Sequence, residues 1–411
     1  MSLENPPKIA NSKEPAEIEQ QDPSTLPLKT RLIELFWVCL KIGLTSFGAP
    51  TAHIAMMQSE FVRKRKWITQ RHFLDLLAAA NLIPGPNASE TCYHVGYVRA
   101  GYPGMIVAGL SFIFPAFSTS MILAWVYMRY GTLPQIEGIF YLLNPLVLAI
   151  VLETTWQIGK ESFDGWKQVA IFVLAIAAKL AGINESIILI GGGVLGLLLH
   201  HTLANLPKKG NPPQLLLAIL PLPFFGEVAS KLSELFKATF WNILVYFFKT
   251  GSILFGSSLV LFALIEDDVV NRFGWLSSQQ LTDAISMGQI TPGPVLSSST
   301  FVGYIAGGFG GALAATIGVF LPSFLIVAIT APLVKKMREN HLAHSMLRGV
   351  NAAVVALILF VCISLGQNAL IDIWTWLAML AGLAVLVLTK AQPFVLVIAG
   401  LALGILRNIL M

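Results

Sequence analysis

The chain has few charged residues for its length. Of its 411 residues only 12% are Asp, Glu, Lys or Arg, whereas 55% are hydrophobic. An ordinary soluble domain carries roughly 25% charged residues. This composition cannot cover a water-exposed surface, so it excludes a soluble globular protein. The net charge of +5 is expected to lie mainly in loops on the cytoplasmic side of a membrane, and it gives no argument for nucleic-acid binding.

Cysteine is also scarce. The three cysteines, at 39, 92 and 362, lie far apart and form no CxxC pair, which excludes a disulfide framework and a cysteine-based zinc site. Two histidine pairs, 200 with 201 and 341 with 344, sit at the ends of apolar stretches without acidic or cysteine neighbours. We interpret them as membrane-interface residues, and we predict no metal and no cofactor.

Long apolar stretches make up most of the chain. Each is long enough to span a bilayer, some only with tilt or local thinning. The first follows the polar, proline-bearing segment 1–30, which lacks the basic start of a cleavable signal peptide and is expected to be disordered. The stretches lie near 32–58, 104–128, 139–158, 168–181, 184–204, 238–265, 310–334, 346–366, 370–388 and 392–409.

An internal repeat divides the chain into two homologous halves. KIGLTSFG from Lys41 recurs as KTGSILFG from Lys249, at an offset of 208. We therefore predict a tail at 1–30, a first repeat at 31–204, a linker at 205–235 and a second repeat at 236–411. The same offset also relates Trp67 to Trp275, Asp75 to Asp283, Pro84-Gly85-Pro86 to Pro292-Gly293-Pro294, and Ser89 to Ser297; after a one-residue deletion, an offset of 207 relates Pro115 to Pro322, Asn144 to Asn351 and Gly159 to Gly366.

The two halves carry their basic loops at different positions. The loop at 63–71 is basic and its counterpart at 266–272 is acidic, whereas the next matched loop is basic only in the second half, at 335–348. Because basic loops face the cytoplasm, we predict opposite orientations in the membrane. The predicted fold is an all-α polytopic membrane protein with two inverted repeats, each of about five spans plus a re-entrant PGP-broken helical hairpin at 73–100 or 281–307. This scheme places the N-terminus outside.

The two PGP motifs are predicted to break their helices. Proline removes a backbone donor and clashes with the preceding turn, and freed backbone groups survive at membrane depth only in a cavity or inside protein. The helix starts that follow offer N–H donors and a partial positive charge, which suit a small anion. We expect the two breaks to face each other and bind it. The predicted substrate-binding residues are Pro84, Gly85, Pro86, Asn87, Ser89, Thr91, Pro292, Gly293, Pro294, Ser297, Ser298 and Ser299. The alternative is a packing kink whose hydroxyls bond to their own helix.

Several ionisable residues lie in apolar surroundings. Lys41 and Lys249 occupy one repeat position and either attract the anion to the site or reach a lipid headgroup. Glu90 and His94 have no charged repeat partner and are candidates for asymmetric proton coupling. An ionised Glu90 would repel the cargo, so we expect it to point away, to be protonated, or to let a proton compete with the anion. Asp75 and Asp283, six residues after the expected caps Thr69 and Ser277, are interpreted as acids that pair with loop cations.

The repeated motifs resemble those of the chromate ion transporter (CHR) family. FGAP at 47–50, IPGP at 83–86 and VGYVRAG at 95–101 look like its first half; FGSS, TPGP, VGYIAGG and FLPS, between 255 and 323, look like its second. Ala49 departs from the family's usual glycine. The resemblance covers the chain from about residue 31 onward. It implies a multi-pass protein of a microbial cell (plasma) membrane that exports chromate.

The alternatives are uptake of sulfate or another anion by the same fold, an intramembrane enzyme, or a scaffold. We find no nucleophile with a base and no paired-acid constellation, which disfavours an enzyme, and a scaffold gives no reason for polar broken helices. The expected partners are a small inorganic anion and the lipid bilayer, with the chain acting alone or as a homodimer.

Overall fold

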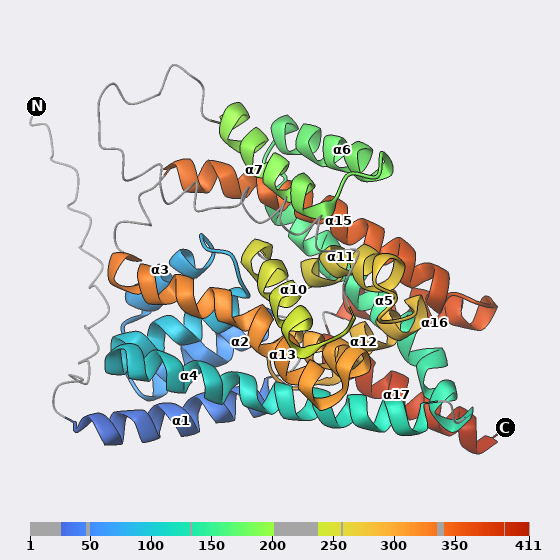
Figure 1. The fold of residues 1–411 in the computed structure, drawn as a ribbon, viewed down its shortest axis with the longest axis horizontal. Coiled ribbons are helices and arrows are strands. Elements are labelled where there is room, and N and C mark those ends of the chain that lie inside the picture. The colour runs from blue at the N-terminus through green and yellow to red at the C-terminus, as the bar shows by residue number, and fades with distance from the viewer. Residues whose placement is uncertain are drawn as a thin grey trace, which may run out of the picture.

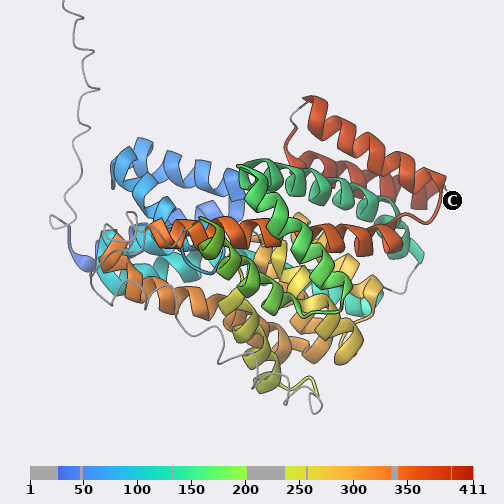
Figure 2. The ribbon, with the colours of Figure 1, turned by 90° about the horizontal axis from the view of Figure 1, so that it is seen from above.

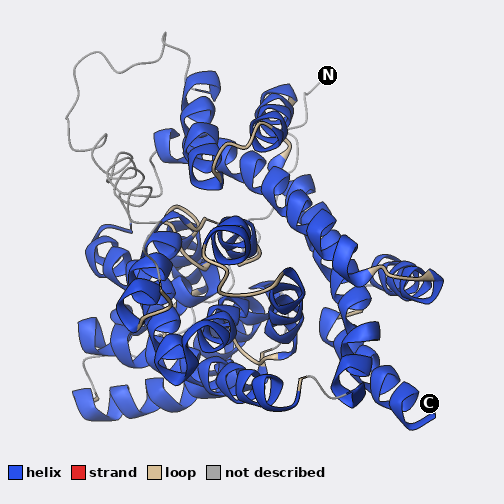
Figure 3. Ribbon diagram, turned by 45° about the vertical axis from the view of Figure 1, so that its right-hand side comes forward, coloured by secondary structure: helices blue, strands red, loops and turns tan. Residues whose placement is uncertain are grey.

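The computed structural model describes residues 26–46, 50–131, 134–200, 237–255, 258–334, 341–389 and 391–410. In these ranges all regular secondary structure is helical (Figures 1 and 3). The predicted linker at 205–235 and nearly all of the predicted tail lie outside the described residues.

Each helical segment of the first half has a counterpart in the second half. The first half contains α1 (Leu28–Thr45), α2 (Pro50–Met57), the π-helix η2 (Gln58–Lys64), α3 (Gln70–Ala80), α4 (Asn87–Tyr130), α5 (Pro134–Ser162), α6 (Trp166–Leu180) and α7 (Glu185–His200). The second contains α10 (Phe240–Ile253), α11 (Val260–Glu266), η5 (Asp267–Arg272), α12 (Ser278–Ile290), η6 (Val295–Ser297) with α13 (Ser298–Thr330) and η7 (Ala331–Leu333), α15 (His341–Ala369), α16 (Ile373–Thr389) and α17 (Pro393–Leu410). The matching order supports a duplicated repeat.

The first apolar stretch of each half is interrupted. Helix α1 ends at Thr45 and Ser46 is extended, with φ −95° and ψ 121°. Helix α10 ends at Ile253 and Leu254 is extended in the same way, with φ −73° and ψ 116°. The expectation of one continuous span near 32–58 and near 238–265 is therefore wrong. In the first half the helix resumes with Pro50 as its first residue, a position where the missing N–H has no cost.

Helices α4 and α13 each fold back on themselves. Gly101 has φ 64° and ψ −154°, and Gly308 has φ 61° and ψ −151°, a region open to glycine. As a result Gly96 lies against Gly104, where a Cβ would come 2.5 Å from the carbonyl oxygen, although eight residues of straight helix span about 12 Å. The short helical arm after each PGP motif therefore runs back along the long helix that follows.

Among the described residues, four helical segments are long and apolar enough to cross a membrane: 87–130, 138–162, 295–333 and 342–369. Helices α7, α16 and α17 contribute shorter apolar segments. Because α4 folds back at Ala100 and Gly101, its crossing segment is the part that begins after the fold. The structure thus has several membrane-length helices, and the count of five spans in each half stays a prediction.

The two halves exchange their last helices. Helix α5 of the first half packs against α16 and α17 of the second, and α15 of the second half packs against α6 and α7 of the first. Figure 2 shows the C-terminal helices (red) beside α5 (green). Glycines allow close approach at both contacts: Gly196 meets the backbone of Gly349, and Gly404 meets that of Ile139. The halves therefore share one packed core.

Candidate functional site

Each PGP motif joins a short capped helix to the fold-back arm. The hydroxyl of Thr69 accepts a hydrogen bond from the His72 backbone N–H at 3.1 Å and starts α3. Ser277 starts α12 with a capping box: its hydroxyl accepts a hydrogen bond from the Gln280 backbone N–H, and Gln280 Oε1 accepts one from the Ser277 backbone N–H. Both predicted caps are confirmed. Helix α3 ends at Ala80 and α12 at Ile290, so each PGP motif lies in a break between helices, as predicted.

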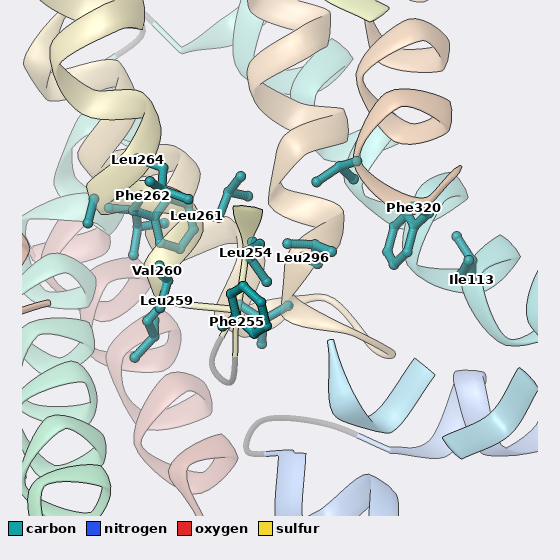
Figure 4. Close-up of a cluster of buried hydrophobic side chains, with 14 of the residues drawn as sticks. Ile113, Leu254, Phe255, Leu259, Val260, Leu261, Phe262, Leu264, Leu296 and Phe320 are labelled. Carbon is teal, nitrogen blue, oxygen red and sulfur yellow. The ribbon is translucent and has the colours of Figure 1, made fainter. Parts of the chain in front are cut away.

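The PGP glycines bind to the opposite half of the protein. The Gly85 N–H donates to the carbonyl of Leu254 at 2.6 Å, and the Gly293 N–H donates to the carbonyl of Ser46 at 2.8 Å. Ser46 and Leu254 are themselves repeat partners and are the extended residues that interrupt the first stretch of each half. Buried hydrophobic side chains, including those of Leu254 and Phe255, line this part of the chain (Figure 4). The reciprocal bonds indicate a two-fold relation between the halves.

Neither PGP glycine leaves room for a side chain. Gly85 has φ +141°, and an added Cβ would overlap Glu90 Oε1 and lie 2.8 Å from Ser323 Cβ in α13. Gly293 has φ +89°, and its Cβ would lie 2.9 Å from Ala116 Cβ in α4. Ala116 and Ser323 are repeat partners at the offset of 207. Each PGP break is therefore seated on the long helix of the other half.

The hydroxyl groups after the second PGP motif are bonded within the protein. Ser298 Oγ donates to the Val295 carbonyl and Ser299 Oγ to the Leu296 carbonyl, both at 2.8 Å. Ser297 Oγ receives a hydrogen bond from Ser120 Oγ in α4 at 3.3 Å. Ser298 and Ser299 therefore fit the alternative interpretation, in which the break is a packing kink and the hydroxyl groups bond to their own helix.

The helix start after the first PGP motif is different. Ser89 and Glu90 are 0% exposed and His94 is 1% exposed. Thr91 bonds to the Asn87 carbonyl at 2.7 Å. The neighbouring polar atoms are buried without any hydrogen-bond partner in the described part of the chain: Asn87 Oδ1, Ser89 Oγ, both oxygens of Glu90, Tyr93 Oη and both nitrogens of His94. Because buried polar groups are normally bonded, this segment of α4 is the strongest candidate for a ligand site.

Glu90 turns toward the PGP break. A Cβ built on Gly85 would overlap its Oε1 atom, so of the three alternatives given for Glu90, the one in which it points away is excluded. Two unit charges 4 Å apart interact by about 4 kcal/mol at an effective dielectric constant of about 20, so a dianion beside an ionised carboxylate would be repelled by about 8 kcal/mol. A dianion at this helix start and an ionised Glu90 therefore exclude each other.

The paired lysines have different surroundings. Lys41 Nζ lies 3.0 Å from Glu60 Oε1 in η2, and Lys64 Nζ lies 2.9 Å from the same oxygen. Burial disfavours the charged carboxylate, but the hydrogen bonds from Lys64 and Lys41 outweigh it and hold the pKa of Glu60 below its ordinary value. In the second half the matching acid, Asp268 in η5, pairs with Arg272 at 2.7 Å. Lys41 thus contributes to a local ion-pair cluster that Lys249 does not repeat.

Asp283 does not pair with a loop cation among the described residues, which corrects the interpretation made for it. It is 4% exposed, and its carboxylate accepts hydrogen bonds from Tyr127 at 2.8 Å, Asn144 at 2.9 Å and Gln279 at 3.0 Å. Ser286 in turn donates to Asn144 Oδ1 at 2.6 Å. Tyr127 and Asn144 belong to the first half, so these five residues form a polar cluster between the halves.

Sequence reasoning missed the residues that receive the PGP breaks: Ser46, Leu254, Ala116 and Ser323. The repeat offset relates Ser46 to Leu254 and Ala116 to Ser323, but nothing in these small or apolar side chains indicates a special role. Asn144 had been noted as a repeated residue, but nothing in the sequence connected it with Asp283 or Tyr127.

The comparisons with known proteins agree with this architecture. The profile of the chromate transporter family matches residues 33–197 and again 241–405, two segments that are related by the repeat offset. The chain is 30% identical over 371 residues to a probable chromate transport protein of Synechococcus elongatus, covering 88% of this chain and 92% of the relative. It is 30% identical over 383 residues to a chromate transport protein of Cupriavidus metallidurans, covering 92% and 93%. It is 32% identical over 368 residues to one from Pseudomonas aeruginosa, covering 87% of each. No solved structure matches significantly.

The duplicated helical fold and its apolar, membrane-length helices define a multi-pass membrane transporter. The chain belongs to the chromate transporter family.

Proposed function

We propose that this protein moves a small divalent tetrahedral oxyanion, chromate, out of the cell, and that the cargo binds where the PGP breaks meet the opposite half. The unpartnered hydroxyl of Ser89 carries the proposal, because it is buried at a helix start, which is a natural anion site, and can donate a hydrogen bond to an anion oxygen. Asn87 and Glu90 flank it in the sequence. Pro84, Gly85, Pro86 and Thr91 form the rest of this end. Pro292, Gly293, Pro294, Ser297, Ser298 and Ser299 form the other, while Lys41 and Lys249 attract the anion.

Energetics favour export. Moving two negative charges outward across an inside-negative potential of about 100 mV releases about 4.6 kcal/mol, which supports a gradient of roughly 2,000-fold. Uptake would have to overcome the same free energy. The second candidate, proton-coupled uptake of sulfate or a similar anion, is favoured by one observation: the buried carboxyl of Glu90 beside the proposed site.

An alternating-access mechanism is part of the proposal. We propose that the halves are inverted in the membrane, that α3 with the arm 87–99 and α12 with η6 and the arm up to Gly307 are re-entrant hairpins, and that one half rocks on the other around the breaks. The helices α3 and α12, with 11 and 13 residues, are about 17 and 20 Å long, short of the roughly 30 Å of a bilayer core.

Labelling of matched positions tests the inversion. Arg63 and Asn271 are repeat partners, and both are exposed. In intact cells an impermeant thiol reagent should modify Asn271→Cys and leave Arg63→Cys unmodified until the cells are permeabilised. The native cysteines Cys39, Cys92 and Cys362 are buried and give little background. Equal labelling of the two sites in intact cells would contradict the inverted arrangement.

Flux in sealed vesicles tests the function. Purified protein should carry radiolabelled chromate and sulfate at rates well above those of protein-free vesicles, and a potential that is negative on the side of the loaded anion should accelerate its exit. Chromate should be carried faster than sulfate. If neither anion crosses faster than in empty vesicles under any potential, the proposed function is wrong.

A further inference from the structure

We propose that Glu90 binds one proton each time the anion binds, so that the protein cotransports H⁺ with a divalent oxyanion and moves one net negative charge instead of two. This inference rests on the proposed function and deepens it. It states which ion is coupled, how many are carried, and which side chain carries it.

The surroundings of Glu90 contain no charge that would hold it ionised. On its own helix it is flanked by Ser89, Cys92, Tyr93 and His94, all buried. From the PGP break it meets Gly85, and α13 brings Ser323 to the same place. No charged group of the described residues acts on Glu90 or His94. Both oxygens of the carboxyl lack a hydrogen-bond donor. A proton is therefore the counter-charge that this position can take up.

Protonation also makes Glu90 useful to the cargo. An ionised carboxyl only accepts hydrogen bonds, as the oxygens of the anion do, so the two repel each other. The protonated carboxyl has one O–H donor, which it directs to an anion oxygen together with Ser89 and the N–H groups of the helix start. Anion and proton therefore bind together and leave together.

The second half has no acid at the repeat position of Glu90. The residue that follows Ser297, at the position of Glu90, is Ser298. Its hydroxyl is 0% exposed and donates to the Val295 carbonyl, so it has no charge to compensate and no free donor. The structure thus assigns one proton to each anion. For export this coupling lowers the gradient that a potential of about 100 mV supports from roughly 2,000-fold to roughly 50-fold.

The charge carried per anion tests the proposal. Full-length protein is placed in vesicles with a tenfold gradient of chromate, equal alkaline pH on both sides so that the free ion is a dianion, and the potential set by a potassium gradient with an ionophore. A tenfold gradient is balanced by about 59 mV for one charge and about 30 mV for two. The wild-type protein should show zero net flux near that one-charge potential, and a gradient of one pH unit should shift the balanced anion gradient about tenfold.

Glu90→Gln keeps the shape of the side chain but cannot take up the proton. The net chromate flux of this variant should be zero near the two-charge potential and should not respond to a pH gradient. Glu266→Gln is the matched control, because Glu266 is a half-buried acid that accepts a hydrogen bond from Ser364 and lies outside the site. Its net flux should be zero at the same potential as that of the wild-type protein. Wild-type balance at the two-charge potential would overturn the proposal even if Glu90→Gln fails to fold. A shift produced by His94→Gln and not by Glu90→Gln would overturn it as well. Wild-type protein that carries no chromate would remove the proposed function itself.

Discussion

Replacing Gly85 or Gly293 with valine is expected to lower transport by at least 100-fold while the protein is still inserted in the membrane. Both glycines have positive φ, at +141° and +89°, where an L-residue costs roughly 1–2 kcal/mol. The new Cβ of residue 85 would overlap the Glu90 carboxyl, and that of residue 293 would press on Ala116. Such overpacking typically costs about 1–3 kcal/mol more. Both substitutions therefore disrupt the contact between the two halves.

Two other glycines serve as controls for backbone strain alone. Gly182 has φ +77° and Gly274 has φ +62°, yet a Cβ at either position would meet no atom within 4 Å. Gly182→Ala and Gly274→Ala should therefore introduce only backbone strain and keep most of the transport activity. Gly85→Ala and Gly293→Ala should lose most of the transport activity, because they add a steric clash between the halves. Vesicle flux normalised to inserted protein is the measurement. Equal losses in all four alanine variants would show that strain, and not the contact between halves, is responsible.

Much of the fold could be predicted from the sequence because it depends on local signals. The repeat offset, the caps at Thr69 and Ser277, and the helix breaks at the PGP motifs all follow from residue types at fixed spacing. The interruptions at Ser46 and Leu254 could not be predicted in this way, because both residues lie inside apolar stretches that are long enough to be interpreted as continuous spans. The exchange of α6 and α7 for α16 and α17 depends on tertiary packing between segments far apart in the chain, for which a single sequence has no local signal.

The candidate site was only partly predictable for a similar reason. The sequence identifies two equivalent PGP breaks and suggests two equivalent sets of hydroxyls. In the structure Ser298 and Ser299 satisfy their own helix, whereas Ser89 and Glu90 have no partner. This difference depends on which atoms are bonded, which residue types do not reveal. Asp283 was misread because an acid near a helix start usually meets solvent or a cation, and its burial against Tyr127 and Asn144 comes from the other half.

Removing the carboxylate of Asp283 should have the second large effect, on stability as well as transport. Asp283→Ala leaves the Tyr127 hydroxyl and the buried Asn144 amide without their acceptor, and each stranded donor costs about 1–3 kcal/mol. Gln279 is exposed and can turn to water. The expected loss in the free energy of unfolding is therefore about 2–6 kcal/mol. Because the two stranded donors belong to the first half and Asp283 to the second, the variant should also transport less by weakening their contact.

A double-mutant cycle separates this contact from general damage. Tyr127→Phe, Asp283→Ala and the double variant are compared by thermal unfolding in lipid, where a hydrogen bond to a charged group predicts a coupling of about 1.5–3 kcal/mol. Asp75→Ala, at the matched but more exposed position, is the control and should lose less stability. Additive single effects, with a coupling below about 0.5 kcal/mol, would show that Tyr127 and Asp283 do not hold the halves together. A strong coupling would show that the hydrogen bond between Tyr127 and Asp283 anchors one half to the other. The proposed rocking of one half on the other would then have to break this hydrogen bond or move both residues together.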